Sequence, residues 1–243
     1  MSLPNPVKHI PNTLTLINLF IGCLSIVSAF EGNLLLAGYL ILLAAIFDYL
    51  DGFSARLLKA YSPLGKELDS LSDVVSFGVA PSVILFHLLK SALGLNYNQG
   101  FIDGNVILAI PFLIAVFSAL RLAIFNLDTR QTTSFIGLPT PANAIFIVGL
   151  VLGLNSPFAA WFSVISSSST AIIVMVIVLS ALLVSPIPMF SLKIISLNLR
   201  ETWRQFLLVI IAMVAIIVFG QASLSIIILS YILISLLSWP FKS

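Results

Sequence analysis

Residues 34–58 read LLLAGYLILLAAIFDYLDGFSARLL, an apolar run that is long enough to cross a bilayer and contains two aspartates near its end. About 20 apolar residues in a helix span the hydrocarbon core. A charged side chain in that core is costly and is kept where it faces a cavity or pairs with cations. The stretch therefore predicts a membrane helix that carries a functional acidic pair, Asp48 and Asp51, near one membrane surface.

The composition of the whole chain predicts a polytopic integral membrane protein. Hydrophobic residues make up 60% of the 243 residues and charged residues only 8%, with a mean hydropathy of +1.16. So few charges could not cover the surface of a soluble domain. Continuous apolar runs disfavour an outer-membrane barrel, whose strands alternate. The single cysteine, Cys23, excludes a disulfide scaffold, and the scattered Lys and Arg residues exclude a nucleic-acid binder.

Apolar runs and their Gly, Pro and polar breakers predict an all-α bundle in a single domain, residues 1–243. About eight transmembrane helices are expected, near residues 14–30, 34–58, 70–92, 105–126, 141–155, 168–185, 205–219 and 222–239. An extension of the fifth helix to about residue 163 stays open. Residues 189–204 are less apolar and fit either a helix on the membrane surface or an ordinary basic loop. The polar, proline-rich Met1–Asn12 gives no sign of a cleavable signal peptide.

The basic residues predict the orientation of these helices. If the termini and the loops after even-numbered helices lie on one side, that side, with the adjoining helix ends, holds ten of the 11 Lys and Arg residues, and only Lys90 lies on the other. Basic residues favour the cytoplasmic side. Both termini are therefore expected in the cytoplasm, with the protein in the cytoplasmic (inner) membrane.

Four of the nine acidic residues fall between positions 48 and 73: Asp48, Asp51, Asp69 and Asp73. The first pair is spaced i,i+3 and the second i,i+4, so each pair lies on one face of its helix. A short turn at 61–65 allows the two helices to run antiparallel, which brings the four carboxylates together just inside the cytoplasmic surface. Their repulsion exceeds what Arg56 and Lys66 can neutralise, and Mg²⁺ or Mn²⁺ prefers such oxygen ligands. The pattern predicts a site for two metal ions; the alternative is a buried ion-pair network or a solvated helix end.

Small and basic residues beside the aspartates fit a phosphate-containing ligand. Gly52 and Ala55 leave a groove next to the carboxylates, and Arg56 and Lys66 add positive charge.

In order, these residues form the pattern Asp48-x2-Asp51-Gly52-x2-Ala55-Arg56-x8-Gly65-x3-Asp69-x3-Asp73. The pattern resembles the complete signature of the CDP-alcohol phosphotransferase family. The resemblance implies a bundle of at least six helices, usually a homodimer, with a two-metal site. It also implies transfer of a substituted phosphoryl group from a CDP-linked donor to an alcohol, with release of CMP and the active site facing the cytoplasm.

The resemblance covers a catalytic core of residues 8–145, with the signature at 48–73, and is weaker in the C-terminal helices, 146–243. Within the family it is strongest to the members that transfer a phosphatidyl group from CDP-diacylglycerol to L-serine. The segments that carry it are PNTLTLINLFIGCLSI (11–26), ELDSLSDVVSFGVAPS (67–82), SALRLAIFN (118–126) and FIGLPTPA (135–142). Ile124 stands where a basic residue is expected, which makes Arg121 the more important cation.

The resemblance also implies roles for individual residues. Asp48, Asp51 and Asp69 would bind metal, while Asp73 would contribute to the second ion and act as the general base. Gly52, Ala55 and Gly65 would admit the nucleotide. Asn12 and Thr15 are expected to contact it, although Asn12 fits a helix cap equally well. The serine pocket is expected at Arg121, Gly137, Leu138, Pro139 and Thr140; Arg121 could instead anchor its helix at the interface.

Two other interpretations stay open. A family member with glycerol-3-phosphate or an inositol phosphate as acceptor should need a denser basic pocket than Arg121 and Arg130 provide. A cation-coupled transporter also buries aspartates, but transporters usually show internal repeats and polar breaks near the midplane. Here the acids gather at one end, without a matching second cluster.

Overall fold

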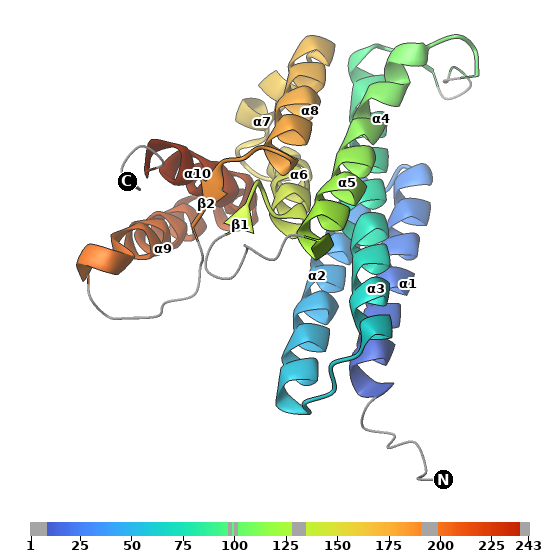
Figure 1. The fold of residues 1–243 in the computed structure, drawn as a ribbon. Helices are drawn as coiled ribbons and strands as arrows, with labels where there is room; N and C mark the ends of the chain where they lie inside the picture. Colours follow the sequence, from blue (N-terminus) through green and yellow to red (C-terminus); the bar gives the residue numbers. More distant parts are fainter. Residues whose placement is uncertain (1–8, 97–98, 100–101, 128–134, 191–198, 239–243) are drawn as a thin grey trace.

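The computed structural model describes residues 9–96, 99, 102–127, 135–190 and 199–238, and these residues are almost entirely helical (Figure 1). The elements in chain order are α1 (Ile10–Phe30), α2 (Leu34–Leu57), α3 (Pro63–Asp73), η2 (Val74–Val79), α4 (Ala80–Ala92), η3 (Val106–Phe112), α5 (Leu113–Leu127), β1 (Phe135–Ile136), α6 (Thr140–Leu154), α7 (Ala159–Ser166), α8 (Ser169–Leu183), β2 (Pro188–Met189), α9 (Leu199–Phe219), η4 (Gly220–Ala222) and α10 (Ser223–Ser238).

The predicted membrane bundle is confirmed as a fold class. Five helical segments of the described chain are long and apolar enough to cross a membrane: Ile10–Phe30, Leu34–Leu57, Pro63–Ala92, Val106–Leu127 and Thr202–Ser238. A sixth is added if α7 and α8, which meet at 83°, form one broken span, and α6 is apolar but shorter. Each of the eight predicted helices coincides with a helix of the structure. That all eight cross the membrane, with both termini in the cytoplasm, stays a prediction.

Several helix bounds differ from those expected. The third helix begins at Pro63 rather than near residue 70, because the hydroxyl of Ser62 accepts a 2.9 Å hydrogen bond from the Gly65 amide and proline suits the first helical position. The fifth ends at Leu154, and the separate helix α7 follows it instead of an extension to residue 163. Of the uncertain segment 189–204, residues from Leu199 on belong to α9, and residues 191–198 lie outside the described residues.

Helix α1 packs closely along the α3–η2 segment. The hydroxyls of Ser72 and Ser76 donate to the carbonyl oxygens of Thr15 and Asn18, at 3.2 and 3.1 Å. Gly22 faces Ser76 so closely that a Cβ atom at Gly22 would collide with its hydroxyl. Small residues allow helix backbones in membranes to approach in this way. Figure 1 shows α1, α2 and α3 side by side, with Asp69 and Asp73 carried by the last of them.

Directly after Asp73 the helix widens into the π-helical segment η2. Such segments inside α-helices are frequent at functional sites. η2 packs against α5 and α6 as well as α1. A Cβ atom on Gly78 would lie only 3.2 Å from Cβ of Ser118 on α5. The widened turn thus brings α5 and α6 next to the helix that carries the aspartates.

The C-terminal helices dock on this core through α6. Helix α6 packs against α2 and α10, and the Ser225 hydroxyl donates to the Phe146 carbonyl at 2.7 Å. The antiparallel strands β1 and β2, which were not predicted, pair Phe135 with Met189. Figure 1 shows α9 and α10 running across the direction of α1 and α2 rather than along it.

Candidate active site

The four aspartates predicted to converge lie on the facing helices α2 and α3. Asp48, Asp51 and Asp69 each place one carboxylate oxygen within 4.8 Å of the other two. Asp73 belongs to the same cluster, because its carboxyl group is within hydrogen-bonding reach of Asp48. The i,i+3 and i,i+4 spacings therefore bring the side chains together as the sequence suggested.

Asp73 has a carboxylate oxygen, Oδ1, that no described residue contacts through a hydrogen bond. Its side chain is buried. A buried carboxylate oxygen without a partner is costly. The oxygen is therefore free to bind a ligand or to accept a proton.

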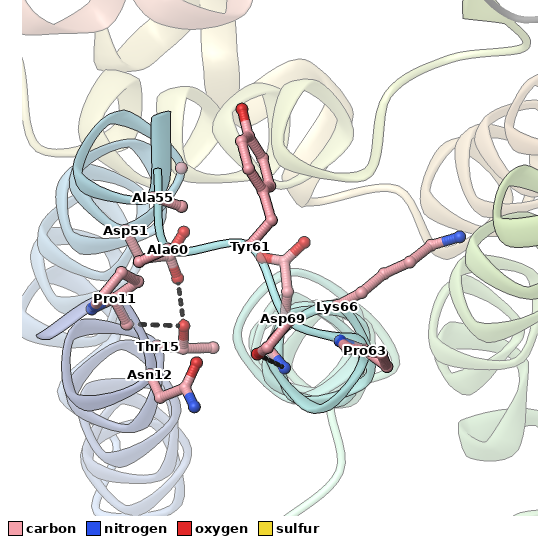
Figure 2. A pocket seen from close by; sticks show the side chains of 13 residues that line it. Pro11, Asn12, Thr15, Asp51, Ala55, Ala60, Tyr61, Pro63, Lys66 and Asp69 are labelled. Atoms are coloured by element: carbon pink, nitrogen blue, oxygen red, sulfur yellow. Dashed lines mark hydrogen bonds between the residues drawn. The ribbon is translucent and has the colours of Figure 1, made fainter. Parts of the chain in front are cut away.

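Asp51 is held by Thr15 of α1. The Thr15 hydroxyl lies 2.6 Å from Asp51 Oδ2, to which it donates, and 3.1 Å from the Pro11 carbonyl oxygen. Figure 2 shows both interactions at one side of the pocket. One threonine thereby fixes the carboxylate of Asp51 relative to α1, so the residue predicted to contact the nucleotide also positions a carboxylate.

The cluster suits a divalent cation. All its donors are carboxylate oxygens, which hard ions such as Mg²⁺ and Mn²⁺ prefer. The partnerless Oδ1 of Asp73 and the close approach of Asp48, Asp51 and Asp69 both leave ligand atoms available. Without a cation, these carboxylates repel one another in a setting of low dielectric constant.

A cavity of about 540 Å³ opens beside the cluster between α1, α2 and α3 (Figure 2). This volume is typical of small-ligand sites. Asp51 and Asp69 contribute to its wall, together with six residues that the sequence analysis assigned to the donor: Asn12, Thr15, Gly52, Ala55, Gly65 and Lys66. Gly65 is required for space, because a Cβ atom there would lie 2.8 Å from Asn12 Oδ1 and 3.0 Å from the Ser62 hydroxyl.

The two basic residues beside the cavity differ in position. Arg56 does not line it; its guanidinium lies next to Gly52 and is exposed. Lys66 lines the cavity but extends away from α1 and α2 (Figure 2), and its Nζ donates to the Asn126 carbonyl oxygen at 3.1 Å. Lys66 therefore also holds the end of α5 against α3.

Sequence reasoning missed five residues that line the cavity: Pro11, Ala60, Tyr61, Ser62 and Pro63. Most of them form the turn between α2 and α3, which was treated only as a connection. The cap formed by Ser62 and Pro63 was the available signal, because it fixes where the turn ends and the cavity wall begins.

The residues predicted to bind the acceptor gather around Arg121. Its side chain is buried, and Nη1 donates to the Thr140 hydroxyl at 3.4 Å. Its guanidinium lies 5.6 Å from the centre of the Phe125 ring and within electrostatic reach of Asp73. These residues do not line the donor cavity. Arg121 is instead close enough to Asp73 to interact with it electrostatically.

The loop that leads to Thr140 is shaped by Gly137. Its φ angle is +77°, and a Cβ atom there would run into the Leu183 carbonyl oxygen. The amides of Gly137 and Leu138 donate to the carbonyls of Ile187 and Leu182, each at 2.9 Å. Pro139 then caps α6 in an extended conformation. The segment after α8 therefore sets the position of Thr140, a dependence that no sequence pattern revealed.

Tyr231 of α10 was not predicted to take part in the site. It is buried and within electrostatic reach of Arg121, and its hydroxyl donates to the Phe190 carbonyl at 3.2 Å. The C-terminal helices thus reach the surroundings of Arg121. A single tyrosine within an apolar helix is only weak evidence, at the level of sequence, for a place in the site.

The clustered carboxylates, the cavity beside them and the signature residues are typical of a phosphotransferase that lies in a membrane. The chain belongs to the CDP-alcohol phosphatidyltransferase family, whose sequence profile matches residues 8–184.

Within this family, relatives of the chain include the following three proteins. The CDP-diacylglycerol–serine O-phosphatidyltransferase of Helicobacter pylori is 33% identical over 239 residues, 98% of this chain and 93% of that protein. The protein of the same name from Methanocaldococcus jannaschii is 42% identical over 147 residues, 60% of this chain and 62% of its own. The archaetidylserine synthase of Methanothermobacter thermautotrophicus is 38% identical over 162 residues, 65% of each chain.

Proposed function

We propose that this protein transfers the phosphatidyl group of CDP-diacylglycerol to the hydroxyl of L-serine, giving phosphatidylserine and CMP. The observation that carries the proposal is the aspartate cluster, in which Asp51 and Asp69 line the cavity and Asp73 is within electrostatic reach of the buried Arg121. A two-substrate transfer needs such an arrangement. The printed names of the relatives support serine as the acceptor.

The cavity between α1, α2 and α3 is assigned to the CDP part of the donor. Gly52, Ala55 and Gly65 leave space for the nucleotide, and Asn12 and Thr15 offer it polar contacts. Lys66, which lines the cavity, and Arg56, whose guanidinium lies next to Gly52 in the cavity wall, would supply positive charge for its phosphates. The acyl chains of the donor would remain in the lipid, since the surrounding helices are apolar on their outer faces.

The four aspartates are assigned to two Mg²⁺ or Mn²⁺ ions. Asp48, Asp51 and Asp69 would coordinate metal directly, and Asp73 would contribute a ligand to the second ion. When bound, the ions would neutralise the pyrophosphate and stabilise the departing oxygen of CMP.

Asp73 is assigned as the general base. The serine oxygen forms a bond to the phosphatidyl phosphorus, the bond between that phosphorus and the CMP oxygen breaks, and the serine hydroxyl proton passes to Asp73. The partnerless Oδ1 atom of Asp73 supports this role. Arg121 and Thr140, with the loop of Gly137 and Pro139, would hold the serine carboxylate, because a guanidinium binds a carboxylate through two parallel hydrogen bonds.

Family resemblance and the distribution of basic residues support an assignment of the membrane, the side on which the site lies and the oligomeric state. We assign the protein to the inner membrane, with the site facing the cytoplasm, and expect a homodimer.

Acceptor competition tests this function. CMP release from CDP-diacylglycerol by the purified protein in detergent should depend on serine, and labelled serine should appear in the lipid product. Glycerol-3-phosphate and inositol phosphate, tested in parallel, should give no transfer. Transfer to either phosphate acceptor instead of serine would reassign the acceptor, whereas no CMP release with any of them would overturn the proposal.

A further inference from the structure

A group of buried polar atoms without hydrogen-bond partners lies near Arg121. Among the described residues these atoms are the Ser118 hydroxyl, Arg121 Nε, and both ends of the Asn143 amide. The Ser118 and Asn143 side chains are fully buried. Leaving such groups without partners costs free energy, so their presence needs an explanation.

The positions of these residues suggest a common ligand. Ser118 and Arg121 are three residues apart on α5, and Thr140 and Asn143 are three apart on α6, so each pair lies on one helix face. The Arg121–Thr140 hydrogen bond joins the two faces. The segment η2, which starts directly after Asp73, packs against both helices. Asn143 therefore lies one helical turn beyond Thr140 on α6, a helix that also packs against η2.

We infer that Asn143 binds the α-ammonium group of an amino-acid acceptor; the inference rests on the function proposed above. Serine is a zwitterion and needs opposite partners for its two charged groups. Arg121 has only donors and can serve the carboxylate alone. The amide oxygen of Asn143 is an acceptor, and the Ser118 hydroxyl can supply a second one. With the carboxylate and ammonium held there, the serine hydroxyl can point towards Asp73.

A neutral amide suits this position better than a carboxylate would. The four aspartates already repel one another, and another negative charge near Asp73 would add to that repulsion. An amide oxygen accepts a hydrogen bond from the ammonium without adding charge.

The test compares serine with two analogues that each lack one charged group. 3-Hydroxypropanoate lacks the ammonium and ethanolamine lacks the carboxylate. Their apparent affinities are measured by competition with serine, for the wild-type protein and for Asn143→Leu. Asn155→Leu is the matched control, since Asn155 ends the same helix and its amide already donates to the Val151 carbonyl at 3.0 Å.

Asn143→Leu should raise the KM for serine roughly 10- to 100-fold, as expected for a hydrogen bond to a charged group. It should weaken the binding of ethanolamine to a similar extent. The affinity for 3-hydroxypropanoate and the KM for CDP-diacylglycerol should stay within about twofold of their wild-type values. Asn155→Leu should change none of these values. Equal weakening of both analogues, or an unchanged KM for serine, would overturn the inference. If Asn143→Leu does not fold, Asn143→Ser decides by the same measurements. Absence of serine-dependent CMP release by the wild-type protein would instead refute the proposed function itself.

Discussion

Asp73 differs from the other three aspartates in having a buried oxygen without a partner and a cation, Arg121, within electrostatic reach. We expect Asp73→Asn to lower turnover about 10²- to 10⁴-fold, because an amide cannot accept the serine proton. Asp69→Asn should instead weaken metal and donor binding together, since Asp69 lines the donor cavity. Turnover and CDP-diacylglycerol binding measured on both variants separate the roles. Near wild-type turnover in Asp73→Asn would assign the base to another group.

The crowding of carboxylates leads to a second prediction at this scale. Because oxygens of Asp48, Asp51 and Asp69 lie within 4.8 Å of one another, activity should be lost in excess EDTA and return with Mg²⁺ or Mn²⁺. Calcium, which prefers longer bonds and more ligands, is the control and should restore less activity. CMP release measures the effect, and full activity in the chelator would contradict a metal site.

Arg121 provides the third prediction. A lysine keeps the charge but cannot form two parallel hydrogen bonds with a carboxylate. Arg121→Lys should therefore raise the KM for serine by about tenfold or more and change the KM for CDP-diacylglycerol much less. Both constants, measured on the purified variant, decide the assignment. A change confined to the lipid KM would place Arg121 at the donor phosphate, and lower protein yield alone would make it structural.

At the scale of elements, the helices could be predicted and their irregularities could not. Apolar runs locate helices because this signal is local. The cap at Ser62 is also local but was overlooked, so the third helix begins earlier than predicted. The π-helical η2 and the β1–β2 pair depend on contacts between distant segments, such as Phe135 with Met189. For the same reason, the sequence revealed the aspartates, which are close along the chain, but not the approach of Tyr231 to Arg121.

The link between β1 and the end of α8 can be tested at Gly137. Alanine there would adopt a φ of +77° and place its Cβ against the Leu183 carbonyl oxygen. Gly32→Ala is the matched control, because Gly32 has a φ of +84° with open space around it. The left-handed conformation alone costs about 1–2 kcal/mol. Thermal unfolding in detergent should show a larger loss of stability for Gly137→Ala than for Gly32→Ala, and equal losses would show that the contact with Leu183 is not tight.

At the scale of the whole molecule, orientation decides whether the site is accessible to cytosolic serine. Ten of the 11 basic residues fall on one side of the predicted topology, the side that carries the turn between α2 and α3. Basic segments are retained in the cytoplasm. The donor cavity lies beside that turn, so it should be accessible from the cytoplasm and not from outside.

Single cysteines can measure this orientation. Cys23 is the only cysteine, so Cys23→Ser gives a background without thiols. Lys59→Cys, in the exposed turn after α2, should react with a membrane-impermeant maleimide only after the cells are permeabilised. Asn96→Cys, exposed after α4, should react in intact spheroplasts. The two positions lie at opposite ends of the single helical segment Pro63–Ala92, so they cannot both be accessible from one side if that segment spans the membrane. The reverse labelling pattern would place the aspartate cluster on the outer side, and serine would then have to reach it from outside the cell.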